Sequence, residues 1–356
     1  MSPEQRAHSI HRTWQRLLDA AYAVRALAPW RWMTADQRFA VRHPDTGELG
    51  YGCVLGHDGD APGFGLHLGA GGLASLGRLL RAPHTPDDPL EALELYIAQR
   101  CLAVTYDDGL DIEPPDPEWA PPVVRAPGPL RPHFRSHHPG CEPWPLSPTE
   151  AMFLSLALEQ TVHVARRLRR SADELAPPVA GLVPTRVADL TLAGLAWRDA
   201  WVWPPAGVPS GAPPFEVDAR RLAGLREVPL GASHGEDGLA WEADYQLMPI
   251  AVQDSIGVRP RYPYRLVVAD QADGAVIVED EVDYDARHAA LRELVMRAVE
   301  ARGRRPAALW VRRPGVQAAL APMAACLEVP LVRVDALQTV SSQRARRGAT
   351  VETGAV

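Results

Sequence analysis

Proline gathers in a few stretches of this chain, and these stretches constrain the fold more than any other feature. Residues 107–148 are acidic first and then rich in proline, and shorter Pro/Gly-rich segments occupy 176–184 and 204–214. Because proline interrupts helices and the interiors of sheets, such stretches form irregular connections between compact parts. A single core rarely grows beyond about 250–300 residues. A chain of 356 residues therefore predicts two domains.

The domain boundaries are expected at these stretches. We expect an N-terminal α+β domain over 1–106, a Pro-rich acidic connection over 107–147, a helical segment over 148–190, a C-terminal α/β domain over 191–340 and a disordered tail over 341–356. Apolar residues make up 46% of the chain, which is enough for both domains to bury a core.

Residue spacing predicts the elements of the first domain. Helical periodicity covers 10–28, and short apolar strands separated by turn residues predict an antiparallel meander over 39–42, 51–55 and 64–68. Helices over 73–80 and 90–99 and a strand over 102–106 follow. Ser147-Pro148-Thr149-Glu150 is typical of a capping box with proline in the first turn, so a helix is predicted to begin there.

The second domain is predicted to be mixed α/β. After a strand over 195–203, the pattern gives strands over 240–247, 265–269 and 275–282, a helix over 286–302, a strand over 307–312, a helix within 315–327 and a strand over 331–334. We expect the helix that contains Pro322 to be kinked or split. The whole chain is therefore predicted as α+β: an N-terminal helix and an antiparallel meander with helices, then a β-β-β-α-β-α-β domain.

All 37 basic residues are arginine, because the sequence contains no lysine. Arginine cannot replace the lysine amine as a Schiff-base nucleophile or as the phosphate ligand of a P-loop. Phosphate-loop NTPases, protein kinases, pyridoxal enzymes, Schiff-base aldolases and Ser-x-x-Lys acyl enzymes are therefore excluded. No cofactor is predicted.

The net charge, the length of the apolar runs and the cysteine spacing indicate which partners and which cellular location to expect. The net charge is −7 and no continuous basic stripe offsets it, so nucleic acid is not expected as a partner. Arg, Glu or Pro breaks every apolar run before the roughly 20 residues of a membrane helix. The four cysteines form no Cys-x-x-Cys pair, so we expect reduced thiols, mostly in the core. These features predict a cytoplasmic protein with no membrane partner.

Several motifs together resemble a known family. They are Pro29-Trp30-Arg31-Trp32-Met33, His43-Pro44-Asp45-Thr46-Gly47-Glu48, Pro132-His133-Phe134-Arg135-Ser136 and, in the second half, Trp241, Arg259-Pro260 and Arg305-Pro306. The chain resembles a bacterial two-domain family catalogued as domains of unknown function, number 7309 at the N-terminus and number 6930 at the C-terminus. The resemblance covers nearly the whole chain. It implies no activity, ligand or catalytic residue.

Two short motifs resemble catalytic or nucleotide sites. Gly69-Ala70-Gly71-Gly72-Leu73-Ala74 fits the dinucleotide pattern, but a Pro-rich segment follows where that fold needs a strand, so a tight strand-to-helix turn is predicted. Ser233 is a candidate nucleophile within Gly-x-Ser-x-Gly. The residues after it predict a loop instead of the helix of a nucleophile elbow, so a surface loop is the favoured interpretation.

Two sets of side chains are candidate metal ligands. His133, His137 and His138 lie near Cys141 and could converge on zinc, although their spacing fits no established zinc signature. Asp244 and Asp270 lie in a strand order that resembles ribonuclease-H-like folds, where carboxylates at strand ends hold two metal ions. The strand that should supply another acid ends in Arg312-Arg313, so this domain would be a degenerate version.

Aromatic residues supply the remaining candidates. Ten tryptophans against five phenylalanines are many, and tryptophan is enriched at interfaces as well as in cores. The candidate binding residues are Trp30, Trp32, Tyr51, Phe134 and Trp144. We expect a non-catalytic binding or adaptor protein with a protein or small-molecule partner. The alternatives are a metal-dependent hydrolase or nuclease that uses Asp244 and Asp270, and a serine hydrolase that uses Ser233.

Overall fold

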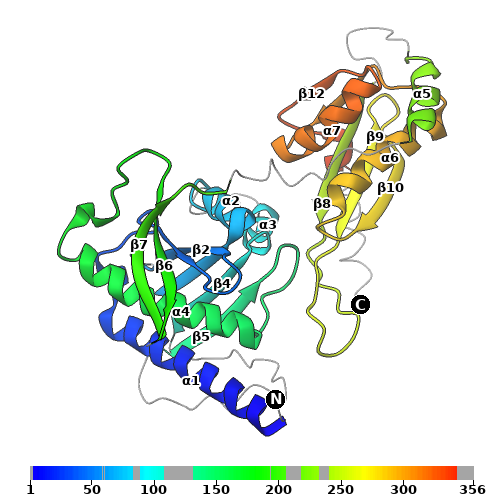
Figure 1. Ribbon diagram of the computed structural model, residues 1–356. Coiled ribbons are helices and arrows are strands. Elements are labelled where there is room, and N and C mark those ends of the chain that lie inside the picture. The colour runs from blue at the N-terminus through cyan, green and yellow to red at the C-terminus, as the bar shows by residue number, and fades with distance from the viewer. Residues whose placement is uncertain are drawn as a thin grey trace. The chain divides into compact units, whose positions relative to one another are not determined.

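The computed structural model describes two compact units (Figure 1). The described residues are 3–57, 59, 61–82, 89–107, 131–192, 194–205, 218–231 and 240–342. The first unit contains Met1–Val208 and Gln253–Pro260, and the second contains Pro209–Val252 and Arg261–Val356. The predicted α+β class is confirmed. Ser233, most of the acidic connection and the tail beyond residue 342 lie outside the described residues.

The first unit is built on a seven-stranded sheet in the order β5-β4-β3-β2-β1-β6-β7. Neighbouring strands run antiparallel except for β1 and β6, which are parallel. The predicted meander forms the middle of this sheet. The strands are β1 (Phe39–Arg42), β2 (Leu49–Leu55), β3 (Gly63–Leu68), β4 (Cys101–Asp107), β5 (Arg131–His137), β6 (Val183–Thr191) and β7 (Gly194–Val202).

Two long helices cover one face of this sheet. α1 (Pro3–Leu27) and α4 (Pro148–Leu168) contact each other, and their buried side chains share a core with alternate residues of the strands, among them Leu17, Leu154 and Leu66 (Figure 1). Burial of each such leucine contributes about 1.5–3 kcal/mol through the hydrophobic effect. α2 (Gly69–Leu79) packs on β2 and β3, and α3 (Pro89–Ile97) contacts α2. The short helices are η1 (Pro29–Arg31) and η2 (Ala172–Leu175).

α4 begins where the capping box predicts. The Ser147 hydroxyl accepts a hydrogen bond from the Glu150 backbone N–H at 3.3 Å, and Glu150 Oε2 accepts one from the Ser147 backbone N–H at 2.7 Å. Pro148 occupies the first turn, where its missing N–H costs nothing. Arg166 and Arg167 lie in the last turn, where positive charge complements the helix dipole.

The second unit contains a five-stranded sheet in the order β10-β9-β8-β11-β12. β8 (Ala240–Leu247), β9 (Tyr264–Asp270) and β10 (Ala275–Val282) are antiparallel, whereas β11 (Ala308–Val311) runs parallel to β8 and to β12 (Leu331–Arg333). α5 (Ala219–Glu227), α6 (Arg287–Arg302) and α7 (Pro314–Cys326) complete the unit. The predicted β-β-β-α-β-α-β order is confirmed over 240–333.

Some elements differ from the sequence expectations. β5 and β6 begin within segments predicted as irregular, and α5 was not predicted. Residues 148–190 supply α4, η2 and the start of the β6–β7 hairpin, so this segment is part of the first unit's core and sheet. β7 extends past the boundary expected at residue 191 and belongs to the same sheet. α7 continues as one helix through Pro322, so it is not split there.

Candidate functional site

A cavity of about 550 Å³ opens in the first unit at the N-terminus of α4. This volume lies within the roughly 300–1,000 Å³ typical of ligand pockets. Its wall contains residues that flank the strands at one edge of the sheet: His43 follows β1, Glu48 precedes β2 and Arg100 precedes β4. Antiparallel neighbours bring the end of one strand and the start of the next to the same edge. The other lining residues are Thr46, Leu68, Leu102, His138, Ser147, Thr149, Glu150, Phe153 and Arg259.

Glu150 is the most constrained charge in this cavity. Its carboxylate accepts hydrogen bonds from the Ser147 N–H at 2.7 Å and from the buried Ser136 hydroxyl at 2.7 Å, and His138 Nε2 lies 3.5 Å away. Burial acts to raise the pKa of Glu150, but the hydrogen bonds from His138, Ser147 and Ser136 outweigh it and hold the pKa at about 2. Glu150 is therefore a fixed anion that anchors α4 and is a poor proton acceptor near neutral pH.

Glu150→Gln is expected to remove an acid-dependent part of the stability. The pKa of Glu150 is lowered from 4.5 to about 2, so its ionised form stabilises the folded state above about pH 5 and this stabilisation is lost as the pH falls toward 2. Glutamine can keep the capping geometry but has no charge to lose. Urea unfolding between pH 7 and pH 3 should show the wild type and the variant converging at low pH. Ser147→Ala is the control: it should cost about 1 kcal/mol while keeping most of the acid-dependent slope, because it removes only one of the hydrogen bonds that lower the pKa of Glu150. A constant difference across this range for Glu150→Gln would contradict the assignment.

His43 presents one defined ring nitrogen for binding. Its Nδ1 accepts hydrogen bonds from the backbone N–H groups of Asp45 and Thr46, both at 3.2 Å. Nε2 therefore carries the ring proton in the neutral form and is left as a donor. The ring also packs edge-on against Phe153 of α4, with 4.8 Å between centroids. These contacts fix the ring at the cavity wall.

Two guanidinium groups contribute positive charge. Arg100 Nη2 lies 3.7 Å from Glu48 Oε1, which is a loose ion pair between partly exposed side chains. Arg259 comes from Gln253–Pro260, a segment of the same unit, and donates to the Ser136 hydroxyl at 3.1 Å. Its buried Nη1 has no hydrogen-bond partner among the described residues. Because this nitrogen is inaccessible to water, a ligand oxygen would reach it only after a shift of the side chain, and Arg259 contributes chiefly positive charge to the wall.

The three histidines considered as candidate metal ligands do not converge. His133 and His137 lie four residues apart on β5, or about 13 Å at the rise of a strand, and His137 packs against Tyr96. His138 lies instead beside Glu150 in the cavity. Burial lowers the pKa of His137 to about 4, with Arg259 and Arg135 acting in the same direction. Across the residues that the structure describes, no three His, Cys, Asp or Glu side chains are grouped as metal ligands.

Asp244 and Asp270 lie on opposite faces of the second sheet. Asp270 pairs with Trp241, and Asp244 lies three positions after Trp241 along β8, so the side chains of Asp244 and Asp270 point to opposite faces. Each carboxylate also faces arginine: Asp244 Oδ1 lies 3.6 Å from Arg313 Nε, and Asp270 Oδ2 lies 2.6 Å from Arg304 Nη2. This geometry does not bring the two acids to one metal centre.

The five aromatic candidates lie mainly in the interior of the first unit. Trp30 and Tyr51 are buried, and Trp30 packs against Tyr106 at 5.3 Å between centroids. Trp32 and Phe134 pack against the core from partly buried positions. Trp144 is also partly buried and pairs through its backbone with Ser136. The five side chains do not make one exposed binding surface.

Two of the four cysteines lie in the core, where most of them were expected. All four are free, and Cys53 and Cys101 are buried whereas Cys141 and Cys326 are partly exposed. Burial raises the pKa of Cys53 to about 12 and also raises that of Cys101. These two thiols are therefore poor nucleophiles.

The structure is that of a two-unit α+β protein with a cavity in its first unit that is lined largely by polar residues. Residues 14–186 match the family described as Domain of unknown function (DUF7309), and residues 232–345 match the family described as Domain of unknown function (DUF6930). These two matches confirm the resemblance seen in the sequence. No curated protein matches the chain. Within the described ranges, every helix is too short or too polar to cross a membrane.

Sequence reasoning did not select Arg100, Glu48 or His43 as site residues. A partial signal was present, because His43 directly follows the strand predicted over 39–42, whereas Glu48 and Arg100 lie three and two positions before the strands predicted to begin at 51 and 102. In an antiparallel meander, residues after one strand and before the next share an edge. The capping box at Ser147 places the α4 N-terminus, but only the pairing of β4 with β3 brings Arg100 to the same edge.

Proposed function

We propose that this chain is a non-catalytic binding protein whose first unit holds a small organic anion in the cavity at the N-terminus of α4. The observation that carries this proposal is the convergence of Arg100, Arg259 and the α4 N-terminus on one cavity of about 550 Å³. Guanidinium groups and helix N-termini both favour carboxylate or phosphate oxygens. The volume leaves room for an organic body beside the charged group.

The two arginines and two glutamates of the lining balance in formal charge, and the hydrogen-bonding groups left over favour an anion over a cation. Glu150 already accepts hydrogen bonds from Ser147 and Ser136, so its charge is largely satisfied within the protein. Glu48 meets only Arg100, at 3.7 Å, and both side chains can move because more than a third of each is exposed. His43 Nε2 remains as a donor, and Arg259 adds positive charge at the wall. Donors thus outnumber the acceptors that a ligand would meet.

The acidic side chains favour binding over catalysis, because none of them is placed or protonated as a catalytic acid or base requires. Glu150 has a pKa of about 2 and serves α4, which suits a structural anion better than a general base. The alternative, a hydrolase or nuclease with a degenerate ribonuclease-H-like second unit, would need Asp244 and Asp270 to share metal ions. Their opposite faces and their arginine partners disfavour that alternative.

Thermal unfolding of the full chain with paired ligands tests the proposed function. Succinate and adenosine 5′-monophosphate are the anions, and succinamide and adenosine are their uncharged counterparts. At about one hundred times its Kd, a ligand should add about 2.7 kcal/mol to the free energy of unfolding of the first unit. We expect stabilisation by at least one anion and none by its uncharged counterpart. Equal shifts with both members of each pair, or no shift with any anion, would overturn the proposal.

A further inference from the structure

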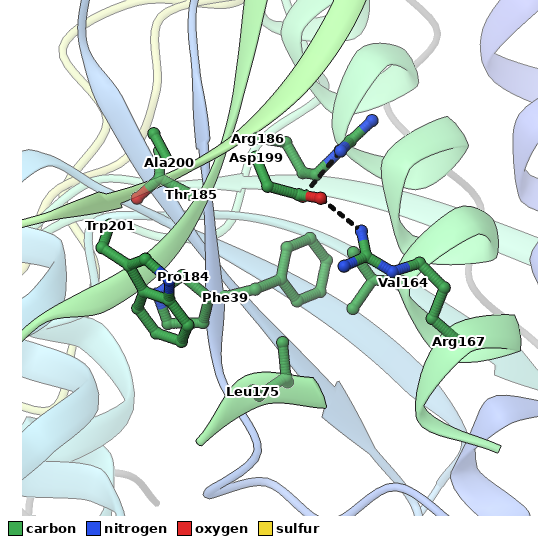
Figure 2. Close-up of a pocket in the computed structure, with 10 residues that line it drawn as sticks. All are labelled: Phe39, Val164, Arg167, Leu175, Pro184, Thr185, Arg186, Asp199, Ala200 and Trp201. Carbon is green, nitrogen blue, oxygen red and sulfur yellow. Dashed lines mark hydrogen bonds and ion pairs between the residues drawn. The ribbon is translucent and has the colours of Figure 1, made fainter. Parts of the chain in front are cut away.

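A second, smaller cavity lies in the first unit near the C-terminal end of α4. It shares no lining residue with the cavity at the N-terminus of α4, which is called the anion cavity from here on. Its volume is about 200 Å³. Figure 2 shows Arg167 and Asp199 on one side of it, Trp201 with Pro184 on the other, and Leu175 between them. The remaining lining residues are Phe39, Val164, Thr185, Arg186 and Ala200.

The charged side of this cavity has an excess of positive charge. Arg186 Nη1 donates to Asp199 Oδ1 at 2.6 Å, and Arg167 Nη1 donates to Asp199 Oδ2 at 2.8 Å, so two guanidinium groups share one carboxylate (Figure 2). Arg186 is buried and is held further by Gln160 Oε1 at 3.0 Å. This arrangement fixes the guanidinium group of Arg186 before any ligand arrives, which lowers the ordering cost of binding.

The rest of the lining is largely apolar and aromatic. Phe39, Val164, Leu175, Pro184 and Trp201 provide it. An engineered cavity of about 150 Å³ holds benzene, so about 200 Å³ suits one ring with a small substituent. Trp201 and the side chain of Asp199 are 38% and 55% exposed, so a ligand can reach the cavity from solvent.

From this juxtaposition we infer that the cavity is a second ligand site, which takes a small aromatic carboxylate. The ring would pack between Trp201 and Phe39, where aromatic contacts add to the gain from apolar burial. The carboxylate would lie beside Asp199, where it accepts from the pair of arginines and neutralises their excess charge. The two cavities share no lining residue, so an experiment can refute ligand binding at one of them without refuting it at the other.

Ligand-observed NMR titration of the full chain tests this site with three probes of one shape. Benzoate carries the carboxylate, benzyl alcohol is neutral and benzamidine is cationic. We expect saturable binding of benzoate and much weaker binding of the other two. Binding of benzoate no stronger than that of benzamidine or benzyl alcohol, or no saturable binding of benzoate, would overturn the inference.

Variants then place the probe in the cavity. Asp199→Asn removes the competing negative charge and should tighten benzoate binding about fivefold. Trp201→Ala removes the aromatic wall and should weaken binding about tenfold or more. Trp203→Ala, a nearby exposed tryptophan outside the lining, should change it by less than about twofold. Equal losses in the two tryptophan variants, or weaker binding in Asp199→Asn, would contradict the proposed pose.

Discussion

Gly72→Ala in α2 is expected to destabilise the first unit by about 1–3 kcal/mol, because its new methyl group would meet backbone atoms that cannot move aside. The added Cβ would lie 2.6 Å from the carbonyl carbon of His67 and 2.9 Å from the carbonyl oxygen of Arg100. That oxygen already accepts the backbone hydrogen bond of Leu68 at 2.9 Å, so relief of the clash would strain the edge of the sheet that carries the anion cavity.

Gly71→Ala is the matched control for this substitution. Gly71 lies one residue earlier in the same helix, and a Cβ built there meets nothing within 4 Å. Since alanine has the higher helix propensity, Gly71→Ala should be neutral or stabilise the unit by up to about 1 kcal/mol. Urea unfolding of both variants measures the contrast. Equal effects of the two substitutions would contradict the close approach of α2 to β3.

Leu154→Ala and Leu294→Ala are each expected to cost about 2–5 kcal/mol, but in different units. Leu154 is fully buried in α4 of the first unit and Leu294 is fully buried in α6 of the second. Because each unit has its own core, the cavity left by each substitution should weaken only the unit that contains it. Hydrogen exchange read by mass spectrometry should show faster exchange in α1 and α4 for the first variant and in α6 and β9 for the second. Faster exchange across the whole chain in either variant would contradict the division into two units.

Strands bounded by turn residues were predictable because their patterns are local. β1, β8 and β10 have the expected bounds. Apart from α5, which was not predicted, the α-helices of both units have the expected positions within a few residues, with an earlier start of α1 and α2. β5 could not be predicted because Pro132 lies within it. The structure accommodates this proline because β5 is the edge strand, where a missing N–H removes no bond to a further neighbour.

The anion cavity was only partly predictable. The start of α4 followed from Ser147 and Glu150, since a capping box depends on residues three positions apart. Arg100 and Arg259 are far apart in sequence, so no local pattern relates them, and only tertiary contacts bring both to the cavity wall. The candidate histidine ligands show the converse: His133, His137 and His138 are close in sequence, but that does not place their side chains around one point.

Anion binding by the first unit is tested most directly by calorimetric titration of adenosine 5′-monophosphate and succinate into three full-length proteins. They are the wild type, Arg100→Gln at the cavity wall and Arg12→Gln, which removes an equal charge from an exposed position on α1. We predict that at least one anion binds the wild type, that Arg100→Gln weakens its binding about tenfold or more, and that Arg12→Gln leaves the Kd within about twofold. Equal dissociation constants in all three proteins, or no binding of either anion to the wild type, would contradict an anion site at the N-terminus of α4.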